Sequence, residues 1–241
     1  MSKVIGITVG TTYDKKKISG SGLTEEQIAL LERIAKDYAD RDYTKMTVKM
    51  TPSGGTYELG SSEDITFSWE FTQDVSSVTF NGNKQEPAEK KGSKKVEGIT
   101  SSSSYEVIGI RADGNQEKAS AKSDINFLNR FYRGYAEIPA DNKIDGEFIK
   151  KLGTMGYATS RSYNCRVKCP NLDDYFWYAY PARFGAAQVT LGDYGRGGCV
   201  LYDEPVYVTN KSGYTEKYLV YRSTESGIGY HYEDGQPFKA T

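Results

Sequence analysis

Hydrophobic and polar residues alternate along several short segments between residues 43 and 127. A period of two predicts β-strands with one face in a core. The clearest case is a run of four inward-facing candidates separated by polar residues: Ile65, Phe67, Trp69 and Phe71. Residues 105–110 and 119–127 repeat the pattern. We therefore expect strands in each of these segments, with the apolar set on one side.

Turns separate these predicted strands. Asn81-Gly82 is the dipeptide that most strongly favours a tight hairpin. The charged stretch from Lys84 to Lys95 has no alternation and is predicted to be a loop. Short strands with turns between them, over about 85 residues, are typical of an immunoglobulin-like sandwich. We assign that module to residues 43–134, without the cysteine pair of antibody domains.

A different period, that of an amphipathic helix, marks residues 23–42. Thr24 is a suitable N-cap, and Gln27 three residues later completes a capping box. Apolar residues then recur on one side of the helix, at Ile28, Leu31, Ile34, Ala35 and Tyr38. An isolated helix this short is marginal in water, so its apolar stripe needs a partner. We predict that these five residues hold copies of the chain together, as a trimer.

The segment before the helix, residues 1–22, has no core of its own. Its apolar strand-like run contains Val4, Ile5, Ile7 and Val9, and a basic and Gly/Ser-rich stretch follows it. An unpaired strand is satisfied by adding to the sheet edge or groove of another protein. We predict that residues 1–20 anchor the chain to such a partner.

Residues 135–241 are aromatic and Gly-rich and predict a second β-domain, a sandwich like the first. A short helix is expected from Asp145 to Leu152. Strands are expected at 206–210 and 218–223, around the turn Lys211-Ser212-Gly213. The fold class is therefore mainly β, with an N-terminal anchor and a short helix ahead of two sandwiches.

An aromatic run from Tyr175 to Pro181 lies within this second domain. Alternation would send Tyr175, Trp177 and Ala179 to one face, and Phe176, Tyr178 and Tyr180 to the other. Three interpretations stay open: a core strand, an inter-subunit seam or a sugar-stacking platform. A core strand or an inter-subunit seam, both of which are packing roles, is favoured over the platform. The residues available for surface or glycan contact would be Tyr175, Trp177, Tyr178 and Tyr180.

Composition narrows the functional classes. The chain has 241 residues, a formal net charge of −1, 20 Tyr and 25 Gly. A nucleic-acid or membrane-surface partner would favour a basic excess, so neither is expected. No segment approaches the ~20 consecutive apolar residues of a membrane span. The N-terminus lacks a signal-peptide core and cleavage site, so we do not expect the usual secretory route.

The sequence offers few arrangements of residues that could carry out catalysis. The single histidine, His231, lies in a polar stretch, and no nucleophile elbow accompanies it. Cys165, Cys169 and Cys199 lack the second ligand pair of a structural zinc site, so free thiols without metal are predicted. A glycan hydrolase would need paired carboxylates in a cleft, and nothing points to them. We expect no enzyme activity and no cofactor.

Several short phrases of the sequence together match a module found in other proteins. The most specific is the run from Ile125 to Gly134, INFLNRFYRG. Others are TYELG from Thr56, ITFSW from Ile65 and VTFNG from Val78. Downstream, the YAYP run at Tyr178 with Phe184-Gly185, and the ending from Tyr218 to Ser223, are similar to the distal domain that accompanies this module.

This resemblance, to proteins of phage tails, collars and head fibres, implies a structural role with no catalytic residues. We therefore expect a virion component, assembled in the host cytoplasm, that projects from the particle and contacts the host surface. Its expected partners are copies of itself and other virion proteins. The alternative is a carbohydrate-binding adhesion module, whose aromatic residues would stack on host-surface glycan.

Overall fold

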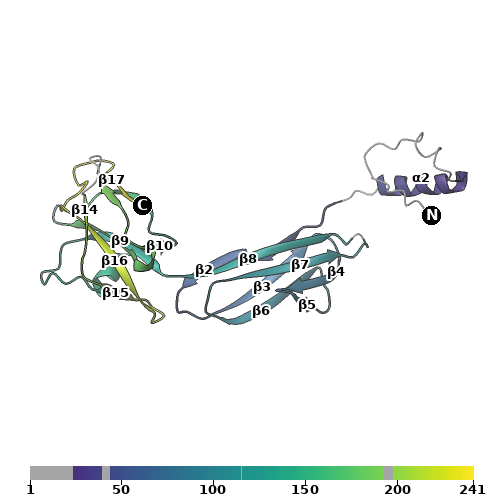
Figure 1. Cartoon of the computed structure of the whole chain (residues 1–241), viewed down its shortest axis with the longest axis horizontal. Helices are drawn as coiled ribbons and strands as arrows, with labels where there is room; N and C mark the ends of the chain where they lie inside the picture. Colours follow the sequence, from purple (N-terminus) through teal and green to yellow (C-terminus); the bar gives the residue numbers. More distant parts are fainter. Residues whose placement is uncertain (1–23, 40–43, 115, 193–197) are drawn as a thin grey trace. The chain divides into compact units, whose positions relative to one another are not determined.

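The computed structural model describes residues 24–39, 44–114, 116–192 and 198–241 (Figure 1). The chain divides into two compact units, Met1–Lys45 and Met46–Thr241. Helix α2 (Glu25–Ala39) lies in the first unit, and the strands lie in the second. The predicted anchor residues Val4, Ile5, Ile7 and Val9 lie outside the described residues.

Helix α2 begins with the predicted capping box. The backbone N–H of Thr24 donates to Gln27 Oε1 at 3.0 Å, and the backbone N–H of Gln27 donates to Thr24 Oγ1 at 3.3 Å. Each side chain thus satisfies a donor that the first helical turn would leave free. Glu25 and Glu26 follow in the first turn, where the helix dipole favours negative charge.

The Ig-like sandwich is confirmed and consists of two facing sheets. Sheet A has the order β1-β3-β6 and sheet B the order β2-β8-β7-β4-β5. The strands of this module are β1 (Val48–Thr51), β2 (Gly54–Glu58), β3 (Glu63–Phe71), β4 (Val75–Phe80), β5 (Asn83–Gln85), β6 (Lys91–Ile99), β7 (Ser103–Arg111) and β8 (Lys118–Leu128).

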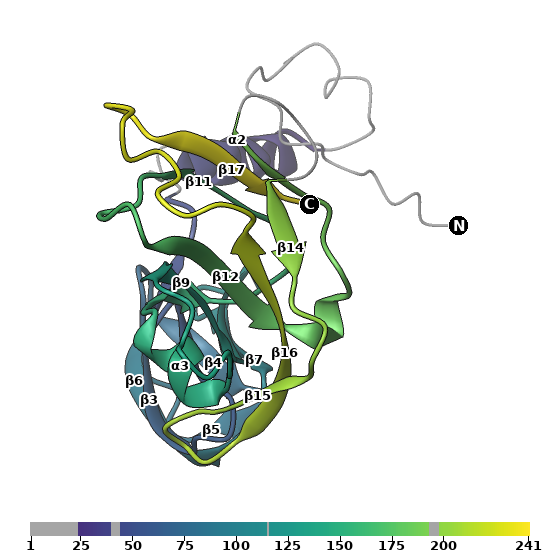
Figure 2. The same cartoon turned by 90° about the vertical axis from the view of Figure 1, so that its left-hand side faces the viewer.

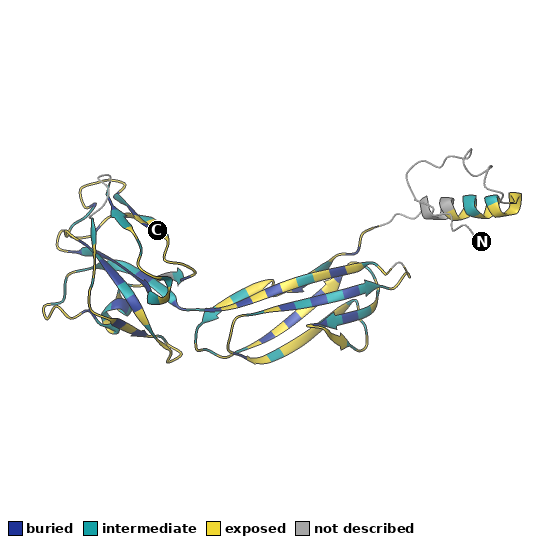
Figure 3. Cartoon of the chain, in the orientation of Figure 1, coloured by how far each residue is buried: buried dark blue, intermediate teal, exposed yellow. Residues whose placement is uncertain are grey.

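The core of the sandwich follows the predicted alternation. Ile65, Phe67, Trp69 and Phe71 on β3 are buried, and the residues between them are exposed (Figure 3). Phe67 stacks on Tyr105 of β7 with ring centroids 4.6 Å apart, so the two sheets meet through aromatic rings. Strand β2 pairs with β8 in parallel, from Gly54 opposite Asp124 to Glu58 opposite Leu128.

The stretch from Lys84 to Lys95 is not the loop that we predicted. Its first part lies in β5, which pairs with β4 around the Asn81-Gly82 turn, and its last part lies in β6. Strand β6 pairs with β3 and is an outer strand of sheet A. Its side chains are largely exposed, which explains why the sequence has no strand-like alternation there.

The predicted boundary at residue 134 is also corrected. Strand β9 (Arg130–Ala136) pairs with β12 (Tyr175–Pro181) and with β10 (Thr154–Tyr157), so it belongs to the C-terminal module. The INFLNRFYRG phrase therefore crosses the module boundary. Its first residues end the Ig-like sandwich, and its last residues begin the next sheet, with Asn129 between them.

The C-terminal module has two sheets and a helix. Sheet C has the order β10-β9-β12-β16-β14, with β15 also on β16, and sheet D has the order β11-β17-β13. Besides β9, β10 and β12, its elements are α3 (Gly146–Lys151), β11 (Tyr163–Val167), the 3-10 helix η1 (Ala182–Phe184), β13 (Val189–Leu191), β14 (Cys199–Leu201), β15 (Val206–Thr209), β16 (Thr215–Ser223) and β17 (Gln236–Ala240). The expected short helix is present and capped by the Asp145 carboxylate.

Sheet C is the middle layer of this module (Figure 2). One face packs on α3 and its flanking segments, and the other packs on sheet D. Strand β12 is central in sheet C, between β9 and β16, and contributes to both cores. Trp177 and Ala179 face α3, whereas Phe176, Tyr178 and Tyr180 face sheet D. The predicted alternation of this strand is confirmed.

Candidate functional site

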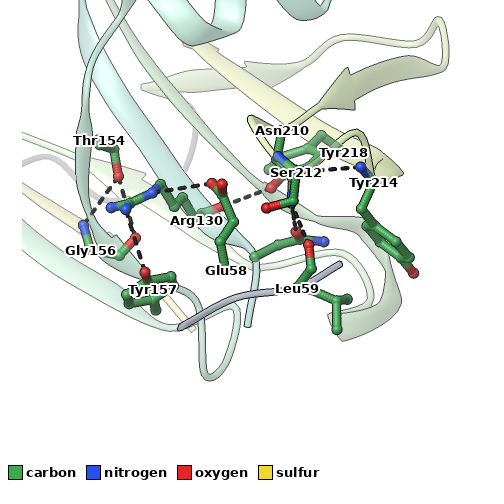
Figure 4. Close-up of polar contacts among 11 residues, drawn as sticks. Glu58, Leu59, Arg130, Thr154, Gly156, Tyr157, Asn210, Ser212, Tyr214 and Tyr218 are labelled. Carbon is green, nitrogen blue, oxygen red and sulfur yellow. Dashed lines mark hydrogen bonds and ion pairs between the residues drawn. The ribbon is translucent and has the colours of Figure 1, made fainter. Parts of the chain in front are cut away.

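A network of hydrogen bonds and an ion pair joins the two β-modules at their junction and connects residues far apart in the sequence (Figure 4). Arg130, the first residue of β9, reaches back to β2, where its Nε lies 3.4 Å from Glu58 Oε1. The same guanidinium lies 4.7 Å from the ring centroid of Tyr157 and donates to its hydroxyl. The backbone carbonyl of Arg130 accepts from the Tyr218 hydroxyl at 2.7 Å. One residue thus connects three strands with the end of the Ig-like module.

Asn210 makes the second set of hydrogen bonds across the junction. Its Nδ2 donates to the Leu59 carbonyl at 2.6 Å and to Asn129 Oδ1 at 3.3 Å. Its Oδ1 accepts from the backbone N–H groups of Ser212 and Tyr214, both at 3.0 Å. The turn after β15 is therefore shaped and attached to the Ig-like module by the same side chain.

Asn129, between the modules, is buried, and its amide also donates to Glu216. Glu216 in turn pairs with Arg183 at 2.9 Å. Burial, the nearby Tyr132 and the Glu216 carboxylate raise the pKa of the Tyr218 hydroxyl, which therefore stays protonated as a donor. The junction is a connected set of satisfied polar groups, and such sets fix geometry.

Sequence reasoning missed this junction. Residues 206–210 were expected as a strand and 211–213 as its turn, and both expectations are met by β15 and by the antiparallel pairing of β15 with β16. The available indication was an Asn directly before Lys-Ser-Gly, since Asn side chains bond to backbone in turns. The contact with Leu59, 151 residues away in sequence, had no local indication.

A second site lies on the α3 face of sheet C, as a cavity of about 330 Å³. Four segments line it: the link between β9 and α3, strand β12, strand β14 with the residues after it, and the end of β16. Trp177 lies at its inner side, with its indole N–H bonded to the Ala136 carbonyl at 3.0 Å. Phe148 of α3 packs edge-on against that ring, with the two ring centroids 4.9 Å apart.

Arg222 is the cationic group of this cavity. Its guanidinium carbon lies 4.8 Å from the Tyr175 ring centroid and 5.8 Å from that of Trp177. Its Nε is enclosed and, within the described part of the chain, has no hydrogen-bond partner. Asn142, Tyr202, Asp203 and Glu204 complete the polar lining. The Tyr202 hydroxyl donates to Glu204 at 3.3 Å. Enclosure and the Glu204 carboxylate raise the pKa of that hydroxyl.

The four aromatic residues proposed for glycan contact do not form a platform. Trp177 and Tyr178 are 1% exposed, and Tyr180 is fully buried. Tyr175 is half-buried and lies under Arg222. Because β12 is covered on both faces, its aromatic residues build the two cores of their own module. The core-strand interpretation of this run is correct, and the platform and seam interpretations, the second of which was favoured equally with the core, are wrong.

The remaining candidates for chemistry are dispersed. The three cysteines are free thiols, and burial raises the pKa of Cys165, that of Cys169 to about 11 and that of Cys199 to about 12. His231 is exposed beside Tyr230. Across the residues that the structure describes, no group of three His, Cys, Asp or Glu side chains could hold a metal ion.

The predicted oligomerisation residues lie on α2. Of these, Ile34 is 43% exposed, and Ile28 and Leu31 are half-buried. The neighbouring Leu30, which was not in the predicted set, is 50% exposed. The side chains of Ala35 and Tyr38 lie outside the described residues. Self-association through this face stays a prediction.

Helices long and apolar enough to cross a membrane were not found in the described residues.

Comparison with known proteins adds little to this picture. No protein-family model matches the chain, and no curated protein does. Among solved structures, the chain aligns with the crystal structure of the N-terminal eight Ig domains of Down Syndrome Cell Adhesion Molecule, isoform 1.30.30, at 10% identity and a TM-score of 0.27. The alignment covers 76% of this chain and only 23% of that one. The Ig-like assignment therefore rests on the strand order and pairing described above.

Proposed function

We propose that this chain is a structural component of a bacteriophage particle, a projecting appendage of the head-fibre, collar or tail-fibre type. The observation that carries the proposal is that the chain has two structurally different units. A short capped helix with an exposed apolar face forms one unit, and two β-modules fastened together by a polar junction form the other. The resemblance of the INFLNRFYRG and YAYP phrases to virion proteins supports the same role.

The helix supplies self-association in this proposal. Leu30 and Ile34 are large apolar side chains left in water, and an apolar stripe on a short helix is stabilised by packing on another helix. A second and a third copy of α2 are the expected partners. Residues 1–20 bind another virion protein, and the β-modules face away from the particle toward the host surface.

The junction supplies rigidity. An appendage must transmit position from its base to its outer end, so its modules should not swing freely. Arg130 bonds to Glu58, the last residue of β2, and Asn210 bonds to the carbonyl of Leu59, the next residue along the chain. Two separate attachments restrict bending at the covalent link between the modules more than the chain alone would.

Self-association is tested by sedimentation equilibrium of the purified chain. We expect a trimer, and we expect Ile34→Asp to shift it to monomer because the new carboxylate would be buried in the helix interface. Arg33→Asp is the matched control, since it places the same side chain at the neighbouring exposed position and should remain trimeric. A wild-type chain that stays monomeric at high concentration contradicts the helix role.

Particle attachment is tested separately by deleting residues 2–20. We expect the truncated protein to fold, as judged by its near-ultraviolet circular dichroism, but to be absent from purified particles. If the truncated chain joins particles at normal copy number, residues 1–20 are not the anchor. If the full-length chain is not found in particles at all, the virion assignment itself fails.

A further inference from the structure

The cavity around Arg222 has the properties of a binding site that the appendage role does not require. Side chains of β16 alternate, so Arg222 lies on the same face as Tyr218 and Val220, which pack under α3. Near the end of the strand this cover is replaced by the cavity, and Arg222 lines it. The enclosed Nε has no acceptor within the described residues. Because protein atoms cover the Nε, a ligand in the cavity would instead meet the terminal N–H groups of the guanidinium, which are not among the enclosed atoms.

The stacking of Arg222 makes its orientation specific. The guanidinium lies over the rings of Tyr175 and Trp177, where it gains cation–π attraction. Trp177 is itself held by Phe148 and by its bond to the Ala136 carbonyl. The donor edge of the guanidinium is therefore positioned before any ligand arrives, which lowers the entropy lost on binding.

The charges of the lining indicate what kind of ligand fits. One guanidinium stands against the two exposed carboxylates of Asp203 and Glu204, so the lining carries a net negative charge at neutral pH. A phosphate, a sulfate or another anion would be repelled by these carboxylates. A ligand that both donates and accepts hydrogen bonds without a charge of its own would satisfy the guanidinium and the carboxylates together.

The apolar part of the lining completes this description. Ile138, Val200 and Leu201 border the polar groups, and Val200 and Leu201 are exposed. The volume, about 330 Å³, lies near the lower end of the range of roughly 300–1,000 Å³ for small-molecule sites. A sugar ring combines hydroxyl groups on its edge with apolar C–H faces and suits both parts. We propose that this cavity binds the terminal sugar of a neutral glycan. This inference goes beyond the appendage role and does not depend on it.

Saturation-transfer difference NMR on the full-length chain tests the proposal. The neutral probes are glucose, galactose, mannose, N-acetylglucosamine and N-acetylgalactosamine. Glucuronic acid, N-acetylneuraminic acid and inorganic phosphate are the charged comparators. We expect saturable binding of at least one neutral sugar, and weaker binding of the charged probes.

Two variants place the binding in this cavity. Arg222→Lys keeps the charge but loses the planar fork of donors, and we expect affinity to fall about tenfold. The double variant Asp203→Ala and Glu204→Ala removes two exposed acceptors without touching the core, and it should weaken neutral sugars by about tenfold or more. Tyr207→Ala is the control. Tyr207 is an aromatic residue that is 58% exposed and lies outside the lining, so its removal should leave sugar binding unchanged.

The proposal is overturned if no neutral sugar in the panel binds saturably, or if a charged probe binds and the neutral ones do not. It is also overturned if the double variant binds the sugar as tightly as the wild type. Thermal melts show whether Arg222→Lys disturbs the packing of Tyr175 and Trp177. Should that variant unfold, the double variant decides alone.

Discussion

All three cysteines of the C-terminal module have a thiol pKa that burial raises. Cys165 and Cys169 lie in or directly after β11, Cys199 begins β14, and all three contribute to the core between sheets C and D. Burial disfavours the charged thiolate, so the thiol pKa rises, to about 11 for Cys169 and to about 12 for Cys199. Groups of this kind are inert toward oxidants and metals at neutral pH.

We predict that the folded protein reacts slowly with Ellman's reagent at pH 8 and that three thiols react at once in guanidinium chloride. The same pKa shifts make stability depend on pH. In the unfolded chain a thiol ionises near its ordinary value of 9.0, before it can ionise in the fold. The contribution of these thiols to the free energy of unfolding is therefore constant below about pH 9 and falls as pH rises toward the folded values of about 11 and 12.

Replacing all three cysteines with alanine is the control for this pH dependence. The loss of stability above pH 9 should become smaller, and the remainder comes from buried tyrosines such as Tyr178, whose pKa is raised by burial. Rapid labelling of all three thiols in the native protein would contradict the prediction, as would stoichiometric zinc in elemental analysis.

At the scale of elements, local sequence was a good guide wherever one face of an element is buried. Strand β3 was predicted for this reason, and helix α2 was predicted from its amphipathic period and the capping box of Thr24 and Gln27. The central strand β12 was predicted with the correct alternation, but not with both faces covered. Burial of both faces depends on how sheet D and α3 fold back onto sheet C, which the local pattern of β12 does not show.

Strand β6 was missed because most of its side chains are exposed, and one of them, Lys94, stands on the core side of the sheet. Lys94 lies opposite Phe67 in the pairing with β3, and residues opposite each other in antiparallel strands share a face. Phe67 is fully buried, so Lys94 begins on the core side and reaches water at the sheet edge, where it is exposed. Inward-pointing lysines on outer strands prevent sheets of different molecules from pairing.

We predict that Lys94→Val changes the free energy of unfolding by less than about 1 kcal/mol but increases aggregation. Light scattering during incubation at moderate temperature measures the effect. Lys95→Val is the matched control: it removes ion pairs with Asp64 and Glu97, which exposed groups make at little gain, but it lies on the outer face. Equal aggregation of the two variants would show that total charge, rather than the inward position, is what matters.

At the scale of the whole second unit, the junction decides whether the β-modules act together. Its residues come from the ends of β2 and β8, from β9 and from the β15–β16 turn. None of these has a local sequence pattern that predicts an interface. The same limitation explains the misplaced boundary: INFLNRFYRG is continuous as a phrase, and only the pairing of β9 with β12 divides it.

We predict that Asn210→Ala lowers the free energy of unfolding by about 2–3 kcal/mol, because the change removes two donated hydrogen bonds at partly buried groups and two accepted ones in the exposed turn. Denaturant unfolding measures this loss. Opening of the junction should also free Arg130 from Glu58, so trypsin should cleave after Arg130 faster than in the wild type.

Asn83→Ala is the control for the junction, since Asn83 makes one local bond to the Asn81 carbonyl in an exposed hairpin. It should leave both the stability and the cleavage at Arg130 unchanged. If Asn210→Ala unfolds at the wild-type denaturant concentration, the contacts of Asn210 do not stabilise the junction.

The parallel pairing of β2 with β8 has a mechanical consequence. The chain enters the sandwich through β1 and β2 and leaves it at the end of β8. A load applied along the chain reaches β1 first, and once β1 has separated from β3 it pulls the start of β2 and the end of β8 in opposite directions. Because these strands are parallel neighbours, from Gly54 opposite Asp124 to Glu58 opposite Leu128, the force shears the whole ladder at once. A ladder loaded in shear ruptures as a set, whereas one peeled from its end opens bond by bond. A protein that tethers a particle in moving fluid would carry tension through its most resistant strand pair.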